Sequence, residues 1–402
     1  MAKEEAAAAA QASLRVEEGL LSRLLVFRED EVEGPARLLW LFHHLVVDGV
    51  SWRILLEDIN IAYAQVAEGQ SPVLGGSSSP LLHWSQAMAR HAEAAVAQGE
   101  VEWWESAVGP RPADAGQYAS GAVATTAVEL DSSTTATLLR KLPRAFNTEI
   151  NHALLTALAL AFQRWNGTEQ LLVELEGHGR EAIDASLDTT ATVGWFTARY
   201  PIRLPAATAF EPGRLLAAVK DALMAVPERG LGYGALRYCS ADDGVRERMR
   251  SLAEAEVSFN YMGQFGRGGE GDDLAFDVVP TKVGHLHGAG VRRAQPLAIS
   301  GTVADACLAL EITHDEAYCS RAEADRLGEL IRKPCASSPS SPVAMGSPAV
   351  RRPTTPAASW TRTSCSAFSP CTAGAIGSNP SILSRRFSTA CCSKQCCTRA
   401  PG

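Results

Sequence analysis

Two segments of the chain carry residue types that can transfer protons. His43 and His44 follow the strand-like segment 37–42, and Glu176 comes directly after the apolar segment 171–175. An imidazole takes up or releases a proton near neutral pH, because its unperturbed pKa is about 6.5. An imidazole and a carboxylate on opposite sides of a carbon centre are the two bases that a proton exchange with inversion requires. Each group also has a structural interpretation, since histidine pairs are more often structural and surface Glu is more often a solvated ion-pair partner.

Both segments are expected to end strands of a layered protein. Residues 37–42 read as a buried strand, and residues 50–68 follow with apolar side chains at helical spacing. The second strand stops at the loop Gly177-His178-Gly179. The alternation of strands and helices predicts an α/β fold. Further helices are expected over 81–108 and from a cap at Asn147, and further strands over 125–130, 200–204, 257–261, 297–303 and 307–312.

The composition describes a globular protein of 402 residues, with 46% hydrophobic and 20% charged residues and a net charge of −8. Residues 333–402 hold eight of the 37 Lys and Arg and none of the 45 Asp and Glu, so the preceding part is strongly acidic. Such a surface argues against nucleic acid as a partner, because phosphate affinity depends on clustered basic residues. No apolar run approaches the roughly 20 residues of a membrane span. The acidic, alanine-rich start lacks the features of a secretory signal, which predicts a cytoplasmic protein without membrane contact.

The tail, residues 333–402, is rich in proline and serine and is predicted to be disordered. A frameshifted reading frame is an alternative origin for it. The segment CCSKQCC at 391–397 lacks the second ligand cluster that a zinc site needs, so a metal or disulfide cluster is disfavoured. His285 and His287 have no third ligand nearby, and the glycine spacing in RGLGYG at 229–234 does not fit a dinucleotide loop.

Five ordered motifs resemble a known enzyme family. HHLVVDGVSW at 43–52 has the HHxxxDG form of the condensation-domain and chloramphenicol-acetyltransferase-like superfamily. Four later segments resemble the epimerization domains of nonribosomal peptide synthetases: ELEGHGRE at 174–181, TVGWFTARYPIRL at 192–204, PERGLGYGALRY at 227–238 and SFNYMGQF at 258–265. The resemblance covers residues 37 to about 332 and does not reach the tail.

The resemblance implies a particular architecture. The family fold has two chloramphenicol-acetyltransferase-like lobes in a V with a tunnel between them. Residues 1–149 would form the first lobe, which carries HHxxxDG, residues 150–332 the second, and residues 333–402 the tail. The family's opening motif has no counterpart before His43, so the resemblance implies an N-terminally truncated, incomplete first lobe with unpaired sheet edges.

The resemblance also implies a reaction, the L-to-D epimerization of the α-carbon of an aminoacyl or peptidyl thioester. The thioester is attached to the phosphopantetheine arm of a peptidyl carrier protein, which is the expected partner. No metal or permanently bound cofactor is expected. His44 and Glu176 would be the acid–base pair, and which of them deprotonates the L form stays open. The alternatives are a condensation or acyltransferase domain that forms an amide bond, and a non-catalytic truncated fragment.

Other motif residues are given supporting roles by the same resemblance. Removal of the α-proton produces an enolate, whose oxygen must meet hydrogen-bond donors, and Asn260 and Tyr261 are the candidates to line that position. Ordinary strand packing is the alternative for Tyr261. Asp48 and Arg180 are expected to pair, because a buried carboxylate is costly unless it is paired. The residues expected to hold the His44 loop are His43, Asp48, Gly49 and Arg180.

Overall fold

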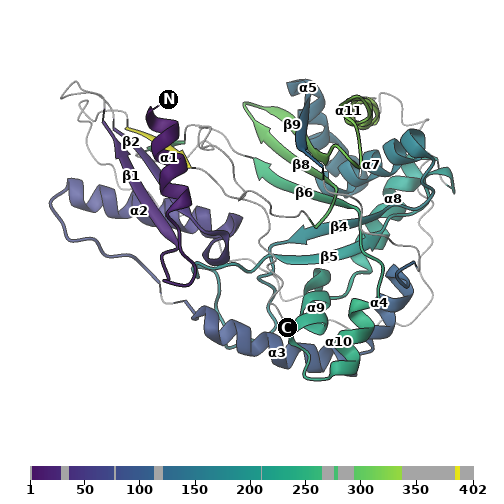
Figure 1. Cartoon of the computed structure of the whole chain (residues 1–402), viewed down its shortest axis with the longest axis horizontal. Coiled ribbons are helices and arrows are strands. Elements are labelled where there is room, and N and C mark those ends of the chain that lie inside the picture. Colours follow the sequence, from purple (N-terminus) through teal and green to yellow (C-terminus); the bar gives the residue numbers. More distant parts are fainter. Residues whose placement is uncertain are drawn as a thin grey trace.

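The protein folds around two β-sheets, which lie in two parts joined along the bottom of the molecule (Figure 1). The structure is a computed structural model that describes residues 2–28, 36–76, 78–112, 121–209, 211–264, 276–278, 294–336 and 385–389. A mixed α/β architecture is thus confirmed. Within these ranges no helix is both long and apolar enough to cross a bilayer.

The larger sheet has six strands in the order β3-β9-β8-β6-β4-β5. β4 pairs with β6 and β6 with β8 in parallel, and the other neighbours are antiparallel. Along β4 the buried Val173 and Leu175 alternate with the half-buried Glu174 and Glu176, because successive strand residues point to opposite faces. The strands are β3 (Val123–Leu130), β4 (Leu172–Gly177), β5 (Ala198–Arg203), β6 (Val257–Gln264), β8 (Leu297–Ala304) and β9 (Cys307–Asp315).

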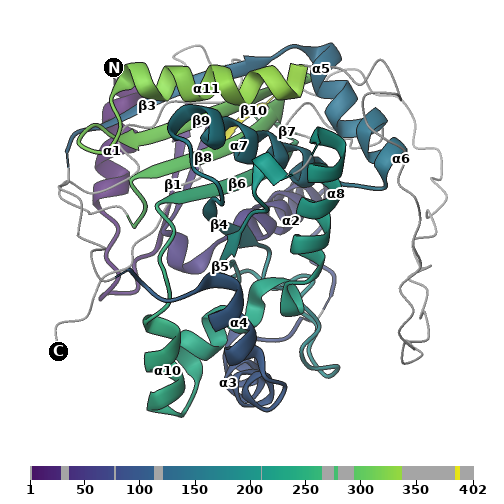
Figure 2. The ribbon, with the colours of Figure 1, turned by 90° about the vertical axis from the view of Figure 1, so that its right-hand side faces the viewer.

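Helices cover the apolar face of this sheet and enclose the main core (Figure 2). Leu154, Leu158 and Phe162 recur at four-residue steps on the central helix and are each about 1% exposed, so this face is fully packed. Val173 and Leu175 of β4 lie in the same core. The helices of this part are α5 (Ser132–Ala136), α6 (Leu142–Phe146), α7 (Ile150–Asn166), α8 (Pro212–Met224) and α11 (Arg321–Ala336).

The predicted helix cap at Asn147 is wrong. α7 begins at Ile150, and its cap is Glu149, which forms a capping box with His152. Asn147 ends the preceding helix α6 in a left-handed conformation with φ 49°. Asparagine is used at either end of a helix, because its side chain caps an N-terminus and its backbone tolerates left-handed angles.

The smaller sheet has four strands in the order β1-β2-β10-β7. β1 runs antiparallel to β2, while β10 lies parallel to both β2 and β7. β2 is therefore hydrogen-bonded on both sides, and β1 and β7 are the two edge strands of this sheet among the described residues. Leu39 and Leu41 of β2 pack with Ala7 in a small second core. The elements of this part are α1 (Ala2–Ala12), β1 (Ser22–Phe27), β2 (Arg37–Phe42), α2 (Gly49–Ala67), β7 (Phe276–Val278) and β10 (Arg385–Thr389).

Two short segments of the predicted tail, residues 333–402, belong to regular elements of the structure. α11 continues to Ala336, because Leu327, Ile331 and Cys335 recur every four residues and are all buried, so the apolar face of the helix runs past the change in composition. β10 is a strand within the tail and fills the place between β2 and β7. The rest of the tail, including the cysteine segment 391–397, lies outside the described residues, as do His285 and His287.

The bottom of the molecule is made of helices that join the two parts (Figure 1). The single helix predicted over 81–108 is two helices, because Gly99 adopts a left-handed conformation with φ 79° between them. β3 belongs to the larger sheet although it precedes residue 150, and β7 and β10 belong to the smaller sheet although they follow it. Each sheet therefore contains strands from both sides of the predicted division at residue 150. These helices are α3 (Leu81–Ala97), α4 (Glu100–Val108), α9 (Leu231–Gly234) and α10 (Asp243–Arg250).

Candidate active site

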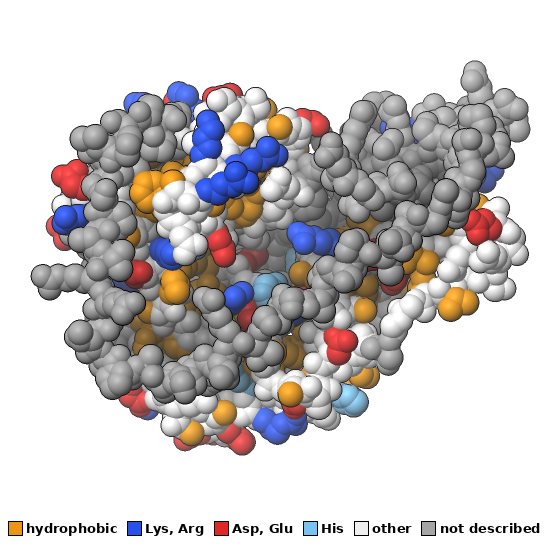
Figure 3. Space-filling view, turned by 180° about the vertical axis from the view of Figure 1, so that it is seen from behind, with side chains coloured by type: hydrophobic (Ala, Val, Ile, Leu, Met, Phe, Trp, Pro, Cys, Tyr) orange, Lys and Arg blue, Asp and Glu red, His pale blue; other side chains and the backbone are white. Residues whose placement is uncertain are grey.

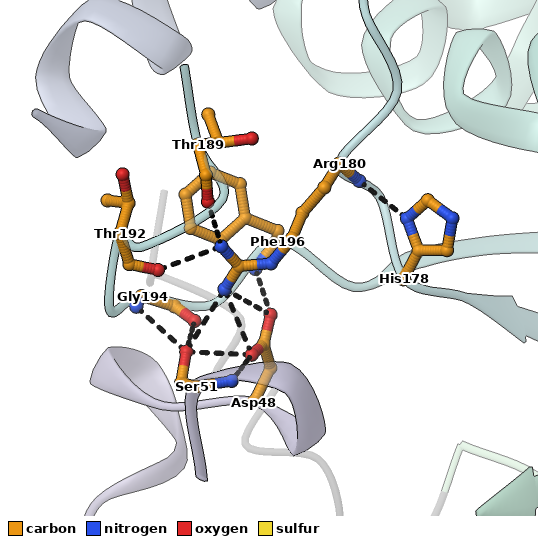
Figure 4. Close-up of polar contacts among 8 residues, drawn as sticks. All are labelled: Asp48, Ser51, His178, Arg180, Thr189, Thr192, Gly194 and Phe196. Carbon is orange, nitrogen blue, oxygen red and sulfur yellow. Dashed lines mark hydrogen bonds and ion pairs between the residues drawn. The ribbon is translucent and has the colours of Figure 1, made fainter. Parts of the chain in front are cut away.

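A buried ion pair joins the HHxxxDG segment to the loop that follows β4 (Figure 4). Asp48 and Arg180 have only 3% and 7% of their side chains exposed, and Arg180 Nη2 lies 3.2 Å from Asp48 Oδ1. Asp48 also caps α2, because its Oδ1 accepts the Ser51 backbone N–H at 2.7 Å. Its Oδ2 accepts the N–H of Phe196 at 3.1 Å. The predicted pairing of Asp48 with Arg180 is therefore present.

Arg180 also holds together the loop between β4 and β5. Its Nη1 donates to the carbonyl oxygens of Thr189 and Thr192, at 2.6 and 2.8 Å. The guanidinium lies 4.0 Å from the centre of the Phe196 ring. The preceding Gly179 has φ +67°, and a Cβ there would lie 1.6 Å from the Phe196 carbonyl oxygen, so only glycine fits. The loop is thus fixed by backbone contacts as well as by charge.

Ser51 belongs to this site although the sequence did not point to it. Its Oγ lies 2.7 Å from Asp48 Oδ1 and 2.8 Å from the Gly194 carbonyl oxygen, and it accepts the Gly194 N–H at 3.0 Å. The signal was available, because a residue three positions after a capping Asp presents its N–H to that side chain. Gly49 is the first residue of α2, directly after this cap.

His43 and His44 lie at the end of β2, as predicted, and begin a single 3-10 turn, His44–Val46. The His43 N–H donates to the Leu21 carbonyl at 2.7 Å, and its Nδ1 accepts the Leu45 N–H at 3.2 Å. His43 therefore supports the backbone of the turn. The His44 ring lies against Trp195 of the GWFT segment, with ring centroids 5.1 Å apart. Trp195 is a second site residue that sequence reasoning missed.

Burial lowers the pKa of His44 below its ordinary value, and the neighbouring charge of Asp48 opposes this shift only in part. We expect its imidazole to be neutral at pH 7 and able to accept a proton. Because the folded protein binds that proton less readily than the unfolded chain, His44 contributes stability above pH 6.5 that is lost as the pH falls below it. Titration of its Cε1–H NMR signal, identified as the signal missing in His44→Ala, should give a midpoint below 6.5, and a midpoint above 6.5 would contradict this assignment.

Glu176 lies on the face of the larger sheet that is turned away from the main core. Its Oε2 accepts a hydrogen bond from Asn260 Nδ2 at 2.6 Å, so two of the predicted residues are in direct contact. Arg199 is its cross-strand partner on β5, with Nε 4.0 Å from Glu176 Oε1. The carboxyl group is therefore flanked by a cation on one side and an amide on the other. Arg199 is a third residue that the motifs did not single out.

Tyr261 lies on the opposite face from Asn260. Its ring packs on the main core beside Gly301, where an added Cβ would lie 3.4 Å from Tyr261 Cδ2. Its hydroxyl group is buried and has no hydrogen-bond partner among the described residues, and burial raises the pKa of this phenol. Packing in the strand thus accounts for Tyr261, and its role at an enolate stays a prediction. Within the ranges that the structure describes, no cluster of three or more His, Cys, Asp or Glu is arranged to hold a metal ion.

The candidate site combines groups from both parts of the molecule. His44 follows β2 of the smaller sheet, Glu176 and Asn260 lie on β4 and β6 of the larger one, and the loop that carries Trp195 contacts both His44 and Asp48. Seen from behind, the molecule is hollowed near the middle of this face, where histidine, acidic and basic side chains are visible (Figure 3). His44 is an imidazole and Glu176 a carboxylate, so each is chemically able to exchange a proton, and Asn260 adds an amide donor beside Glu176.

These features agree with a family assignment. A sequence model described as "Condensation domain" matches residues 1–333, so the chain belongs to the condensation-domain family. The chain is 38% identical over 277 residues to part of a linear gramicidin synthase protein of Brevibacillus parabrevis, a match that covers 67% of this chain and 5% of that protein. It is 37% identical over 322 residues to chondramide synthase of Chondromyces crocatus, covering 77% of this chain and 8% of that protein. The chain thus spans only a small part of these synthases.

Solved structures show the same fold. The epimerization domain from the third module of tyrocidine synthetase B superposes with a TM-score of 0.73 and 31% sequence identity, and the match covers 83% of this chain and 75% of that one. The condensation domain of the monacolin K polyketide synthase superposes with a TM-score of 0.58 at 16% identity, which shows the fold alone.

Proposed function

We propose that this domain epimerizes the α-carbon of an aminoacyl or peptidyl group from L to D while the group is held as a thioester. The thioester partner is a carrier protein with a phosphopantetheine arm, which the domain does not bind permanently, and the reaction belongs to cytoplasmic nonribosomal peptide synthesis. The two parts of the molecule correspond to two chloramphenicol-acetyltransferase-like lobes in a V.

The observation that carries the proposal is the placement of Glu176. It lies on a strand of the larger part, fixed by Asn260, while His44 follows a strand of the smaller part. Amide formation needs at most one general base for the attacking amine, whereas inversion at carbon needs a proton acceptor on one face and a donor on the other. A second acid–base group from the opposite part is therefore expected of an epimerase and superfluous in a condensation domain. The 31% identity to an epimerization domain supports the same conclusion.

The chemistry follows from these groups. One of the pair removes the α-proton, the electron pair of the C–H bond moves into the thioester carbonyl, and an enolate forms. Its oxygen needs hydrogen-bond donors. Asn260 has two N–H donors, of which one bonds Glu176, so the other is available for this oxygen. The protonated partner then returns a proton to the opposite face, which leaves the D form and restores both groups over a full cycle.

Isotope incorporation tests this function directly. A carrier protein loaded with a set of L-aminoacyl thioesters is incubated with the domain in heavy water, and the product is examined for deuterium at the α-carbon and for chirality. Epimerization gives deuterated D product. A condensation domain supplied with an acceptor amine gives an amide without deuterium, and a non-catalytic fragment leaves the substrate L and unlabelled. Either of the last two outcomes overturns the proposal, after correction for exchange in the absence of the domain.

A further inference from the structure

Trp195 lies between two residues that are hydrogen-bonded to the beginning of α2 (Figure 4). On one side the Gly194 N–H donates to Ser51 Oγ at 3.0 Å. On the other side the Phe196 N–H donates to Asp48 Oδ2 at 3.1 Å. Asp48 caps α2, and Ser51 lies in its first turn. The backbone on both sides of Trp195 is therefore attached to the segment that carries HHxxxDG.

The Ser51 hydroxyl group is fully used in this connection. A serine hydroxyl has one proton to donate and two lone pairs that accept. Ser51 Oγ accepts the Gly194 N–H and a hydrogen bond from Arg180 Nη2 at 3.1 Å. Its own proton can go to Asp48 Oδ1, at 2.7 Å, or to the Gly194 carbonyl oxygen, at 2.8 Å. Because Ser51 is fully buried, removal of its hydroxyl leaves the Gly194 N–H without this partner.

The His44 ring is held in a different way from most acid–base histidines. Such a ring is usually oriented by a hydrogen bond at the nitrogen that does not react. His44 Nδ1 is buried and has no hydrogen-bond partner among the described residues. The ring lies instead against the Trp195 indole, with centroids 5.1 Å apart and ring planes at 56°. The indole is therefore placed to restrain the imidazole in one orientation.

We propose that Trp195 is a positioning residue that holds the His44 imidazole in the orientation for proton transfer, and that Ser51 fixes Trp195 in turn. The inference rests on the proposed role of His44 in epimerization, and it requires no contact between Trp195 and the substrate. Orientation matters because a displacement of about 1 Å at a reacting group can slow a reaction about 10²-fold. The effects of substitutions at Trp195 and Ser51 should therefore be confined to the proton transfer that His44 performs.

The first test measures exchange of the α-proton for deuterium separately with L and D carrier-bound substrate. For the enantiomer whose exchange is lost in His44→Ala, Trp195→Ala should lower kcat about 10²-fold with little change in KM. Exchange of the other enantiomer should stay within about twofold of the wild-type rate. Trp195→Phe keeps an aromatic ring at this place and should recover most of the rate. Ser51→Ala should slow the same enantiomer about tenfold, because Trp195 then keeps only its attachment at Phe196.

The second test does not depend on turnover. An aromatic ring displaces the NMR signals of protons that lie near it, so the Cε1–H signal of His44 reports the position of the Trp195 indole. In Trp195→Ala this signal should move towards the position of an exposed histidine. In Ser51→Ala it should move in the same direction by a smaller amount. The signal is identified as the one missing in His44→Ala.

Thr135→Val is the matched control for Ser51→Ala. Thr135 is buried, and its Oγ1 accepts the Leu308 N–H at 2.9 Å and donates to the Leu130 carbonyl oxygen at 3.4 Å. The change therefore removes a buried hydroxyl that joins two backbone segments of the larger part. It should lower the urea midpoint of unfolding about as much as Ser51→Ala does, while exchange with both enantiomers and the His44 signal stay at their wild-type values.

Trp165→Ala is the control for Trp195→Ala, since it removes an indole that packs on the Phe162 ring of α7 at 5.3 Å. Equal slowing of both enantiomers in Trp195→Ala, or a His44 signal that stays in place, overturns the inference. If Trp195→Ala fails to fold, Ser51→Ala decides, because wild-type exchange in that variant overturns the inference as well. Displaced His44 signals in a protein that leaves its substrate L and unlabelled would overturn only the proposed function.

Discussion

Glu176→Gln and His44→Ala should each abolish inversion, lowering the rate at which L substrate becomes D by at least about 10³-fold. Glutamine keeps the shape of Glu176 and can still accept the Asn260 hydrogen bond at its amide oxygen, but it cannot take up a proton. Alanine at 44 removes the imidazole that packs against Trp195. Each variant therefore lacks the proton acceptor or donor on one face of the α-carbon.

The two variants should differ in the exchange that remains. If each group serves one face, the surviving group can still remove and return the proton on its own face without inversion. Glu176→Gln should then incorporate deuterium at the α-carbon of only one enantiomer of the carrier-bound substrate. His44→Ala should incorporate it into only the other enantiomer. Exchange measured separately with L and D substrate in heavy water thus assigns each group to its enantiomer, which the sequence leaves open.

Suitable controls are Glu169→Gln and His83→Ala, which change exposed residues of the same types. Both should retain wild-type inversion. Inversion that survives in Glu176→Gln and in His44→Ala would remove these residues from the reaction. Loss of inversion accompanied by loss of exchange with both enantiomers in each variant would show that the two groups act together on one face.

The strands that carry the site could be predicted from the sequence, because each is a short apolar run ended by glycine or histidine. β2 and β4 begin or end within two residues of their expected positions. Asp48 and Arg180 were also paired correctly, because the family resemblance of their two motifs implies this pair and a buried carboxylate is costly unless it is paired. Short sequence motifs were sufficient for these residues.

Contacts made across strands could not be predicted in the same way. Arg199 meets Glu176 only because β4 and β5 pair in one particular register, and Trp195 meets His44 only because a long loop folds back on the other part of the molecule. Neither fact leaves a local pattern. β10 is a further case, since it forms between two strands that are remote in sequence and its own composition predicts disorder.

Asp48→Ala should lower the free energy of unfolding by about 3–5 kcal/mol, because it leaves Arg180 charged, buried and without its carboxylate partner. It also removes the cap of α2 and the acceptor of the Phe196 N–H. Arg180→Ala should cost a similar amount, since Asp48 then loses its cation. Urea unfolding of the whole chain, followed by tryptophan fluorescence, measures both changes.

The double variant distinguishes a true pair from two independent losses. If the ion pair accounts for the effect, Asp48→Ala with Arg180→Ala should cost clearly less than the sum of the single changes, because neither buried charge remains. The control is Arg90→Ala, which breaks the ion pair of Arg90 with Asp184 on the same loop. Arg90 is 62% exposed, so this loss should stay below about 1 kcal/mol. If the losses in the free energy of unfolding are additive, Asp48 stabilises the protein as a helix cap and Arg180 stabilises it through its hydrogen bonds to the loop between β4 and β5. The two side chains would then have no energetic coupling.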